Sequence, residues 1–172
     1  ITAWTGVASA PFGTPTLCTL LKIDFAALAK EKIMTPQQLG RMREDFEQSI
    51  GEPNDLLVFV VDEVSFLQPE ALHLIDVQLR RLLDRPAVPF GGVIVILAGD
   101  FWQKPPPSST SLAEQLVSID APIKTRAQIA PNSNRMKGLS LFREARRTVL
   151  TQQMRAADDP AFQTELDHMR ST

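Results

Sequence analysis

The length, composition and charge of this chain exclude several classes of protein. It has 172 residues, of which 44% are hydrophobic, and a net charge of -2, so it suits one ordinary domain. Its single cysteine, Cys18, excludes an internal disulfide and a Cys-rich zinc site, and no apolar run approaches the roughly 20 residues of a membrane span. Because there is no overall positive charge, any nucleic-acid site has to be local.

The first third of the chain reads as a short strand followed by helices. Residues 1–4 have the pattern of a strand, and residues 5–21 hold a turn and short helical pieces broken by proline and glycine. A longer helix is expected to begin at Pro36, because Thr35 can cap it and Gln38 completes a capping box. Its apolar stripe recurs at near-helical spacing and comprises Leu39, Met42, Phe46 and Ile50.

An acidic pair follows the next apolar run. Residues 56–61 are consecutively apolar, which is typical of a parallel strand that is buried on both faces and covered by helices. Asp62 and Glu63 follow at once, at the carboxyl end where open α/β sheets bind ligands. In P-loop nucleoside triphosphatases the first such carboxylate orders Mg²⁺ and the second polarises the attacking water. The alternative is a buried strand that merely reaches the surface at a polar turn.

A second apolar strand ends in the same way and favours nucleotide chemistry. A helix from Pro69 to about Asp84 leads to residues 93–98, and Gly99 permits a tight exit from that run. Gln103 then offers an amide that can donate to a phosphate oxygen and accept from water. We expect the two strands to be neighbours in one mostly parallel sheet, with their carboxyl ends forming one site. The predicted buried stripe of the helix is Leu72, Ile75, Leu79, Leu82 and Leu83.

The last third of the chain contains fewer regular elements. Residues 104–111 are rich in proline and serine, so we expect no regular secondary structure there. Residues 120–137 are polar and are expected to form an exposed connection. The remaining expected elements are helices at 112–119 and 138–146, a short strand at 148–151, and a last helix that starts at Asp159-Pro160.

The start of the chain predicts a piece of a longer protein. The chain begins at Ile1, in what reads as the middle of a strand and without an initiator methionine. Its glycines never form the G-x-x-x-x-G-K-[ST] phosphate loop, which normally precedes an acidic strand of this kind. We therefore expect that loop upstream of residue 1.

Three segments, in this order, carry a resemblance to a known family. They are LLVFVVDEVSFL, PFGGVIVILAGDFWQKPPP and LTQQMRAADDPAF, and the opening ITAWTGVASAPFGTPTLCTLL fits the same family. The chain resembles the Pif-one-type DNA helicases, relatives of RecD in helicase superfamily one, except at about 22–54 and 108–137. This resemblance implies an α/β fold, a RecA-like P-loop NTPase core with a mostly parallel sheet flanked by helices. Residues 1–172 would be the first motor domain, with the Walker A loop upstream and the second motor domain downstream.

The resemblance also implies an ATP site. Asp62 matches the Walker B carboxylate that holds Mg²⁺, and Glu63 matches the general base that orients the hydrolytic water. Gln103 matches the residue that senses the γ-phosphate and couples hydrolysis to movement of the second motor domain. Arg155 matches an arginine that approaches the γ-phosphate, where a guanidinium would offset developing charge. The alternative for Arg155 is an exposed side chain paired with a nearby aspartate.

The opening segment would contact DNA in such a protein. Thr5, Gly6 and Thr16 match positions that approach the single-strand backbone, where amides, hydroxyls and glycine allow close phosphate contact. Phe12 could stack on a base, or it could be a core phenylalanine. Cys18 stands where the family usually has a histidine, and we expect it to be buried rather than reactive. The implied partners are single-stranded DNA and DNA junctions or forks, with no membrane.

The best interpretation is part of an ATP-dependent DNA helicase that translocates on single-stranded DNA and unwinds duplexes in repair, recombination or telomere maintenance. We expect a monomer inside the cell, in the nucleus or mitochondrion of a eukaryote or otherwise in the cytoplasm, and we expect the isolated fragment to be inactive. The alternatives are the helicase module of a rolling-circle transposon, a non-hydrolysing DNA-binding or assembly module of the same fold, and a metal-dependent nuclease using Asp62, Glu63 and Asp100.

Overall fold

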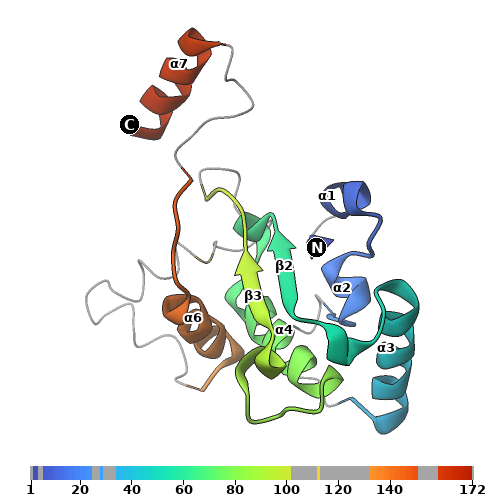
Figure 1. Cartoon of the computed structure of the whole chain (residues 1–172). Helices are drawn as coiled ribbons and strands as arrows, with labels where there is room; N and C mark the ends of the chain where they lie inside the picture. Colours follow the sequence, from blue (N-terminus) through green and yellow to red (C-terminus); the bar gives the residue numbers. More distant parts are fainter. Residues whose placement is uncertain are drawn as a thin grey trace.

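A parallel sheet of three strands organises the part of the chain that the computed structural model describes, which is residues 2–3, 6–24, 28, 34–101, 112, 132–150 and 159–171. The strand order is β1 (Thr2–Ala3), β2 (Val58–Asp62) and β3 (Ile94–Leu97) (Figure 1). Thr2 pairs with Val61, and Val58 pairs with Ile94, both in parallel register. The strands predicted at 1–4, 56–61 and 93–98 are therefore confirmed as β1, β2 and β3, and so is the predicted parallel pairing of the last two.

Helices and helical turns make up most of the other described residues. The opening segment forms the predicted short pieces, α1 (Gly6–Ser9), the 3-10 turn η1 (Ala10–Phe12) and α2 (Leu17–Leu20). The two helices that flank β2 in sequence are α3 (Pro36–Ser49) and α4 (Pro69–Leu82). The remaining elements are the 3-10 turns η3 (Pro53–Asp55), η4 (Val64–Phe66) and η5 (Pro89–Gly92), and the helices α6 (Asn134–Glu144) and α7 (Pro160–Ser171).

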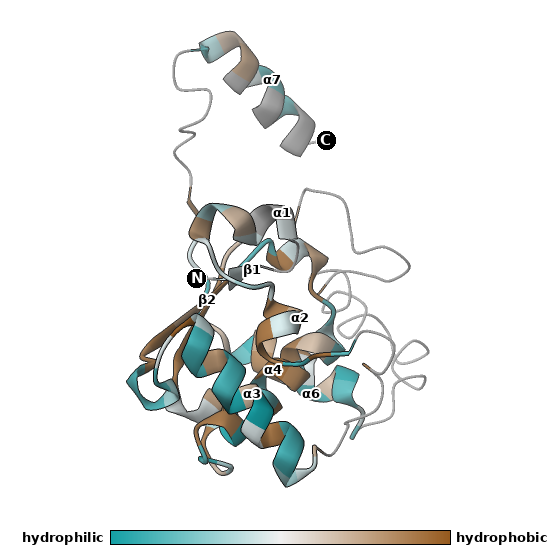
Figure 2. Ribbon diagram, turned by 90° about the vertical axis from the view of Figure 1, so that its right-hand side faces the viewer, coloured by the Kyte–Doolittle hydropathy of each residue, from teal (hydrophilic) through white to brown (hydrophobic). Residues whose placement is uncertain are grey.

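The start of α3 confirms the capping box expected from the sequence. The Thr35 hydroxyl accepts a hydrogen bond from the Gln38 backbone N–H at 3.2 Å, and Gln38 Oε1 accepts one from the Thr35 N–H at 3.0 Å. Met42 and Phe46 of the predicted stripe are buried, whereas Ile50 at the end of the helix is 43% exposed. The rest of α3 is mainly hydrophilic, in contrast to α2 and α4 (Figure 2).

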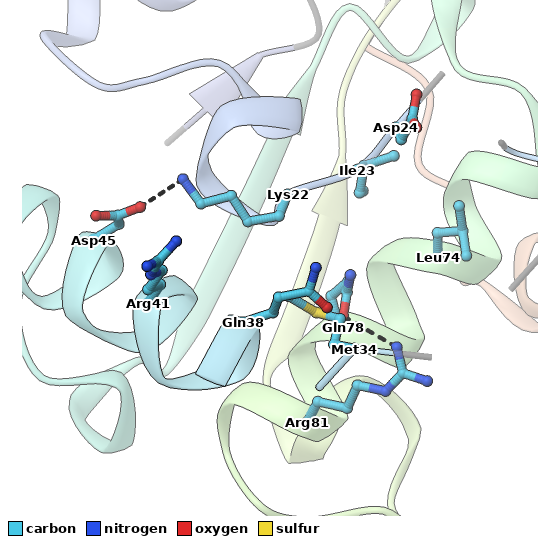
Figure 3. A pocket seen from close by; sticks show the side chains of 10 residues that line it. All are labelled: Lys22, Ile23, Asp24, Met34, Gln38, Arg41, Asp45, Leu74, Gln78 and Arg81. Atoms are coloured by element: carbon cyan, nitrogen blue, oxygen red, sulfur yellow. Dashed lines mark hydrogen bonds and ion pairs between the residues drawn. The ribbon is translucent and has the colours of Figure 1, made fainter. Parts of the chain in front are cut away.

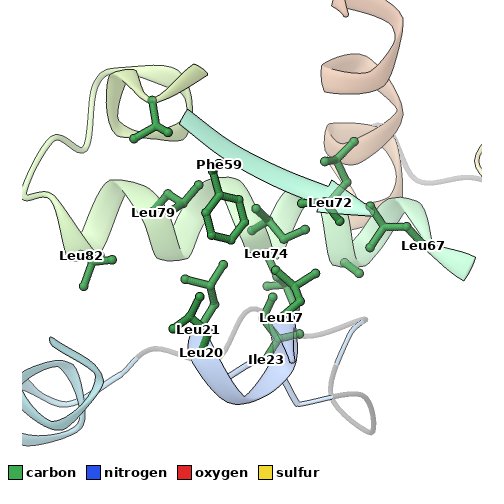
Figure 4. Close-up of a cluster of buried hydrophobic side chains, with 14 of the residues drawn as sticks. Leu17, Leu20, Leu21, Ile23, Phe59, Leu67, Leu72, Leu74, Leu79 and Leu82 are labelled. Atoms are coloured by element: carbon green, nitrogen blue, oxygen red, sulfur yellow. The ribbon is translucent and has the colours of Figure 1, made fainter. Parts of the chain in front are cut away.

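The hydrophobic core lies between one face of the sheet and helix α4. Phe59 and Val61 point to this face from alternate positions of β2, and both are buried. Leu17 and Leu21, from α2 and its C-cap, join the same cluster (Figure 4). The predicted stripe of α4 is confirmed, since each of its members is buried: Leu72, Ile75, Leu79, Leu82 and Leu83.

The opposite face of the sheet differs from the prediction. Val58 is 44% exposed, and its β3 neighbours Ile94 and Ile96 are 64% and 47% exposed. The prediction that the apolar strand at 56–61 is buried on both faces is therefore wrong for the described residues. The physical reason is that α4 covers the face carrying Phe59 and Val61, while no described helix covers the other one.

A buried aspartate fixes the turn that leads into β3. Asp76 on α4 is 4% exposed, and its Oδ1 accepts hydrogen bonds from Arg80 Nε at 2.8 Å and from the Phe90 backbone N–H. Phe90 and Gly91 both have positive φ, of 51° and 64°, inside η5. A Cβ on Gly91 would lie 2.7 Å from Leu83 Cδ1, so glycine is needed here for both conformation and space.

The bounds of α4, α6 and a predicted strand correct three details of the sequence analysis. Helix α6 begins at Asn134 rather than near 138, because the Ser133 hydroxyl caps it by accepting from the Met136 N–H at 3.3 Å. Residues 148–150 form no strand, and Leu150 is 91% exposed. Helix α4 ends at Leu82, two residues before the predicted end. The expected start of the last helix is confirmed, since Asp159 Oδ1 accepts from the Phe162 N–H at 3.0 Å.

Candidate functional site

The acidic pair lies where β2 leaves the sheet. Asp62 is the last residue of the strand and is half-buried, and its Oδ1 accepts a hydrogen bond from the Glu63 backbone N–H at 2.8 Å. Its second carboxylate oxygen accepts no hydrogen bond from the described residues. One oxygen therefore orients the carboxylate, and no described residue occupies the other.

Glu63 has an uncommon backbone conformation. Its φ and ψ are 56° and 44°, in the left-handed region that residues other than glycine rarely adopt. The turn is held from both sides, because the Val64 N–H donates to Ala98 O at 2.9 Å and the Phe66 N–H donates to Glu63 O at 3.0 Å. Such strain costs on the order of 1–3 kcal/mol and concentrates at functional sites.

The Glu63 side chain adds a second unusual feature. Its Oε2 is buried and has no hydrogen-bond partner among the described residues. Buried polar atoms are nearly always paired, so an orphaned carboxylate oxygen is a candidate for binding a water or a ligand. Ser65 Oγ, two residues further on, is also buried without a partner. The same turn thus contains two buried oxygens that no group of the described residues satisfies.

The ends of β2 and β3 are in direct contact. The Ala98–Val64 hydrogen bond joins them, and a Cβ on Gly99 would lie only 2.7 Å from Val64 N. The segment that starts at Gly99 therefore leaves the sheet at the same edge as Asp62, as the sequence predicted. Gln103 itself lies outside the described residues, so its distance from Asp62 stays a prediction.

Of the other predicted site residues, some lie outside the described residues and some lie within them. Thr5 and Arg155 lie outside the described residues. Gly6 is exposed at the start of α1, and Phe12 is 43% exposed in η1, so the alternative that Phe12 is a core residue is wrong. Thr16 caps α2, because its Oγ1 accepts from the Thr19 N–H at 3.3 Å. These residues follow β1, and Ala3 of β1 is the register partner of Asp62.

The structure adds two contacts behind the site that the sequence did not reveal. Gly138 of α6 lies so close to α4 that a Cβ there would overlap the Pro69 carbonyl oxygen. Phe142 of α6 packs edge-to-face on Phe101, with ring centroids 5.9 Å apart. Helix α6 therefore contacts both the start of α4 and the segment just before Gln103. No local sequence pattern predicts such contacts, because they join residues that are far apart in the chain.

The described residues contain no group of three or more His, Cys, Asp or Glu side chains that could hold a metal ion. Asp62, Glu63 and Asp100 are all described, and they do not form such a group, which argues against the alternative of a metal-dependent nuclease.

Within the described residues, no helix is long and apolar enough to cross a membrane. Cys18 is half-buried rather than fully buried as expected, and burial raises the pKa of its thiol from 9.0 to about 11, which favours the unreactive thiol form.

These features define an α/β protein with a parallel sheet and a candidate site at its carboxyl edge. The model of the PIF1-like helicase family matches residues 1–171, and the chain belongs to this family. It is 26% identical to ATP-dependent DNA helicase PIF5 of Trypanosoma brucei brucei over 182 aligned residues, which cover 99% of this chain and 18% of that protein. It is 32% identical to ATP-dependent DNA helicase PIF1 of Saccharomyces cerevisiae over 108 residues, which cover 63% and 12% respectively.

A solved structure shows the same fold. The crystal structure of Pif1 helicase from Candida albicans superposes with a TM-score of 0.58 at 23% identity, covering 99% of this chain and 33% of that one. The predicted RecA-like α/β fold is therefore shown. The chain spans a third or less of the length of these relatives.

Proposed function

We propose that this chain contributes part of the ATP-hydrolysing site of an ATP-dependent DNA helicase, as a portion of its first RecA-like motor domain. One observation carries the proposal, namely the orphaned, buried Oε2 of Glu63 beside Asp62 at the carboxyl edge of a parallel sheet. Membership of the PIF1-like helicase family supports it. The relatives from Trypanosoma and yeast are both ATP-dependent DNA helicases by name.

Asp62 suits the role of holding Mg²⁺. Its carboxylate is oriented through Oδ1, while the other oxygen is free of hydrogen bonds from the described residues. Mg²⁺ prefers oxygen ligands and keeps several waters, so one carboxylate together with nucleotide phosphates is a usual donor set. When bound, Mg²⁺ would neutralise charge on the phosphates of ATP.

Glu63 suits the role of general base. Its unpaired Oε2 can accept a hydrogen bond, and then a proton, from the water that attacks the γ-phosphate. The fixed turn lowers the cost of orienting the carboxylate, because Val64 is bonded to Ala98 before any ligand arrives. Gln103 and Arg155 are proposed to contact the γ-phosphate, with Gln103 coupling hydrolysis to domain movement.

The opening segment is proposed to contact single-stranded DNA during translocation and unwinding of junctions or forks. The exposed ring of Phe12 is free to stack on a base, while Thr5, Gly6 and Thr16 would approach the phosphate backbone. Because β1 joins this segment to the strand that carries Asp62, DNA and nucleotide sites would be linked through the sheet. We further propose an intracellular protein acting in DNA repair, recombination or telomere maintenance.

The proposal is tested in the full-length protein with three variants. Glu63→Gln should still bind ATP but lose about 10²–10⁴-fold in hydrolysis, the usual cost of losing a general base. Asp62→Asn should weaken binding of Mg²⁺·ATP, and Gln103→Ala should bind ATP and DNA but couple hydrolysis poorly to unwinding. The measurements are nucleotide affinity, ATPase activity with single-stranded DNA, and unwinding. Glu44→Gln on the exposed side of α3 is the matched control and should behave like the parent.

Two results would contradict the proposal. If Glu63→Gln unwinds DNA like the parent, Glu63 is not the base. If the full-length parent binds DNA but hydrolyses no ATP, the chain belongs to a non-hydrolysing DNA-binding or assembly module. The isolated 172-residue chain should bind ATP weakly and show no steady turnover.

A further inference from the structure

A cavity of about 320 Å³ lies between α3, α4 and the segment that follows α2 (Figure 3). Gln38 and Arg41 line it from α3, and Gln78 and Arg81 line it from α4. None of the described residues that line it belongs to the acidic pair or to the segment expected to contact DNA. The cavity is therefore separate from the site described above.

The two glutamines present hydrogen-bond donors to the cavity. Gln38 Oε1 already accepts from the Thr35 backbone N–H, and Gln78 Oε1 accepts from Arg81 Nη1 at 3.4 Å. Neither amide NH₂ group donates a hydrogen bond within the described residues, so both donors can serve a ligand. Gln78 is 6% exposed, so its amide is held in place by packing.

The charged side chains favour an anion. Lys22 Nζ and Asp45 Oδ2 form an ion pair at 2.6 Å on the rim, and this pair largely neutralises itself. The other charged residues among the described lining are Arg41, Arg81 and Asp24, and of these Arg81 and Asp24 have further interactions within the protein. Arg41 is exposed, and its guanidinium makes no hydrogen bond or ion pair with the described residues, so within that part of the chain it can donate to a ligand oxygen.

The floor of the cavity is apolar. Ile23 and Leu74 are 6% and 7% exposed and line it together with Met34. A ligand that fits both parts needs an anionic group with several acceptor oxygens and an apolar body. The volume is at the lower end of the roughly 300–1,000 Å³ typical of small-molecule sites.

We propose that this cavity binds a small organic anion, a phosphate monoester or a carboxylate attached to an apolar ring or short chain. The anionic group lies between Arg41, Gln38 and Gln78, and the apolar body contacts Leu74 and Ile23.

The test uses the 172-residue chain and four probes: phenyl phosphate, benzoate, inorganic phosphate and benzyl alcohol. Titration calorimetry should show saturable binding of at least one of the two ring-bearing anions, weaker binding of inorganic phosphate and none of benzyl alcohol. The preference between phenyl phosphate and benzoate distinguishes the two anionic groups. Arg41→Gln should weaken the preferred anion about tenfold, the loss of one charge-assisted hydrogen bond.

Controls separate this site from the proposed ATP site and from general charge effects. Arg147→Gln removes an exposed guanidinium that does not line the cavity, and Glu63→Gln changes the acidic site, so both should bind the preferred anion like the parent. Arg81→Gln is the second cavity variant, and thermal melting checks that each variant is folded. The proposal is overturned if neither anion saturates, if benzyl alcohol binds equally well, or if both Arg41→Gln and Arg81→Gln bind like the parent.

Discussion

The close contact between α6 and α4 leads to a prediction about stability. Gly138→Ala should lower the free energy of unfolding, whereas the same change at Gly40 should raise it. In the structure, a Cβ on Gly138 would overlap the Pro69 carbonyl oxygen and lie 2.5 Å from its carbonyl carbon, where ordinary contacts are 3.4–4 Å. Pro69 is the first residue of α4, and its backbone cannot rotate away as a flexible side chain could. Gly138→Ala should therefore push α6 away from the start of α4.

The magnitude follows from two opposing terms. Overpacking of this kind usually costs about 1–3 kcal/mol, and contact with backbone places it near the upper end. Replacing glycine by alanine inside a helix returns about 1 kcal/mol of helix propensity. The net expectation is a free energy of unfolding lower by about 2 kcal/mol, which corresponds to a Tm lower by about 4–8 °C for a chain of this size.

Gly40→Ala in α3 is the control, because it makes the same chemical change in a helix where nothing lies within 4 Å of the new Cβ. There only the propensity term remains, so the unfolding free energy should rise by about 0.5–1 kcal/mol. Thermal and urea unfolding of the parent and both variants, followed by circular dichroism, measure the difference. Equal stabilities of Gly138→Ala and Gly40→Ala would refute the close packing of α6 on α4.

Two further expectations concern a buried ion pair and the cysteine. Asp76→Ala should lower the unfolding free energy by about 3 kcal/mol, the lower end for breaking a buried pair, because it leaves Arg80 and the Phe90 N–H without their acceptor. Asp45→Ala, which breaks a pair with side chains 35% and 52% exposed, should cost about 0–1 kcal/mol in the same urea titration. Burial raises the pKa of Cys18 from 9.0 to about 11, and only the thiolate reacts with iodoacetamide. At pH 8 the folded chain should therefore react about a hundredfold more slowly than the urea-unfolded chain. Equal rates would contradict the burial of the thiol.

Local patterns in the sequence were sufficient for much of the fold. The capping box at Thr35 and Gln38 specifies where α3 begins, and helix periodicity specifies the buried stripe of α4. Each of these signals involves residues within a few positions of one another. The two apolar runs that end in polar residues also predicted the parallel pairing of β2 and β3, because a shared carboxyl edge requires neighbouring strands.

Features that depend on distant parts of the chain were not predictable. Apolar strand residues such as Val58 and Ile94 look alike whether or not a helix covers them, so the exposure of one sheet face was missed. The early start of α6 was missed because Ser133 lies in a polar stretch that reads as loop. The acidic pair was found from its residue types, but the left-handed backbone at Glu63 follows from the turn after β2, which no local pattern specifies.

The contact between the two strand ends explains why the acidic motif and the segment that begins at Gly99 belong to one site. The Val64 N–H bonds to Ala98, and the missing side chain at Gly99 lets the two backbones approach. A displacement of the segment after β3 must therefore change the turn that holds Glu63, because packed backbones cannot move independently. Phe101 extends this contact to Phe142 of α6. The arrangement gives a physical route by which groups that follow Gly99 in the chain, Gln103 among them, can affect the position of the proposed base.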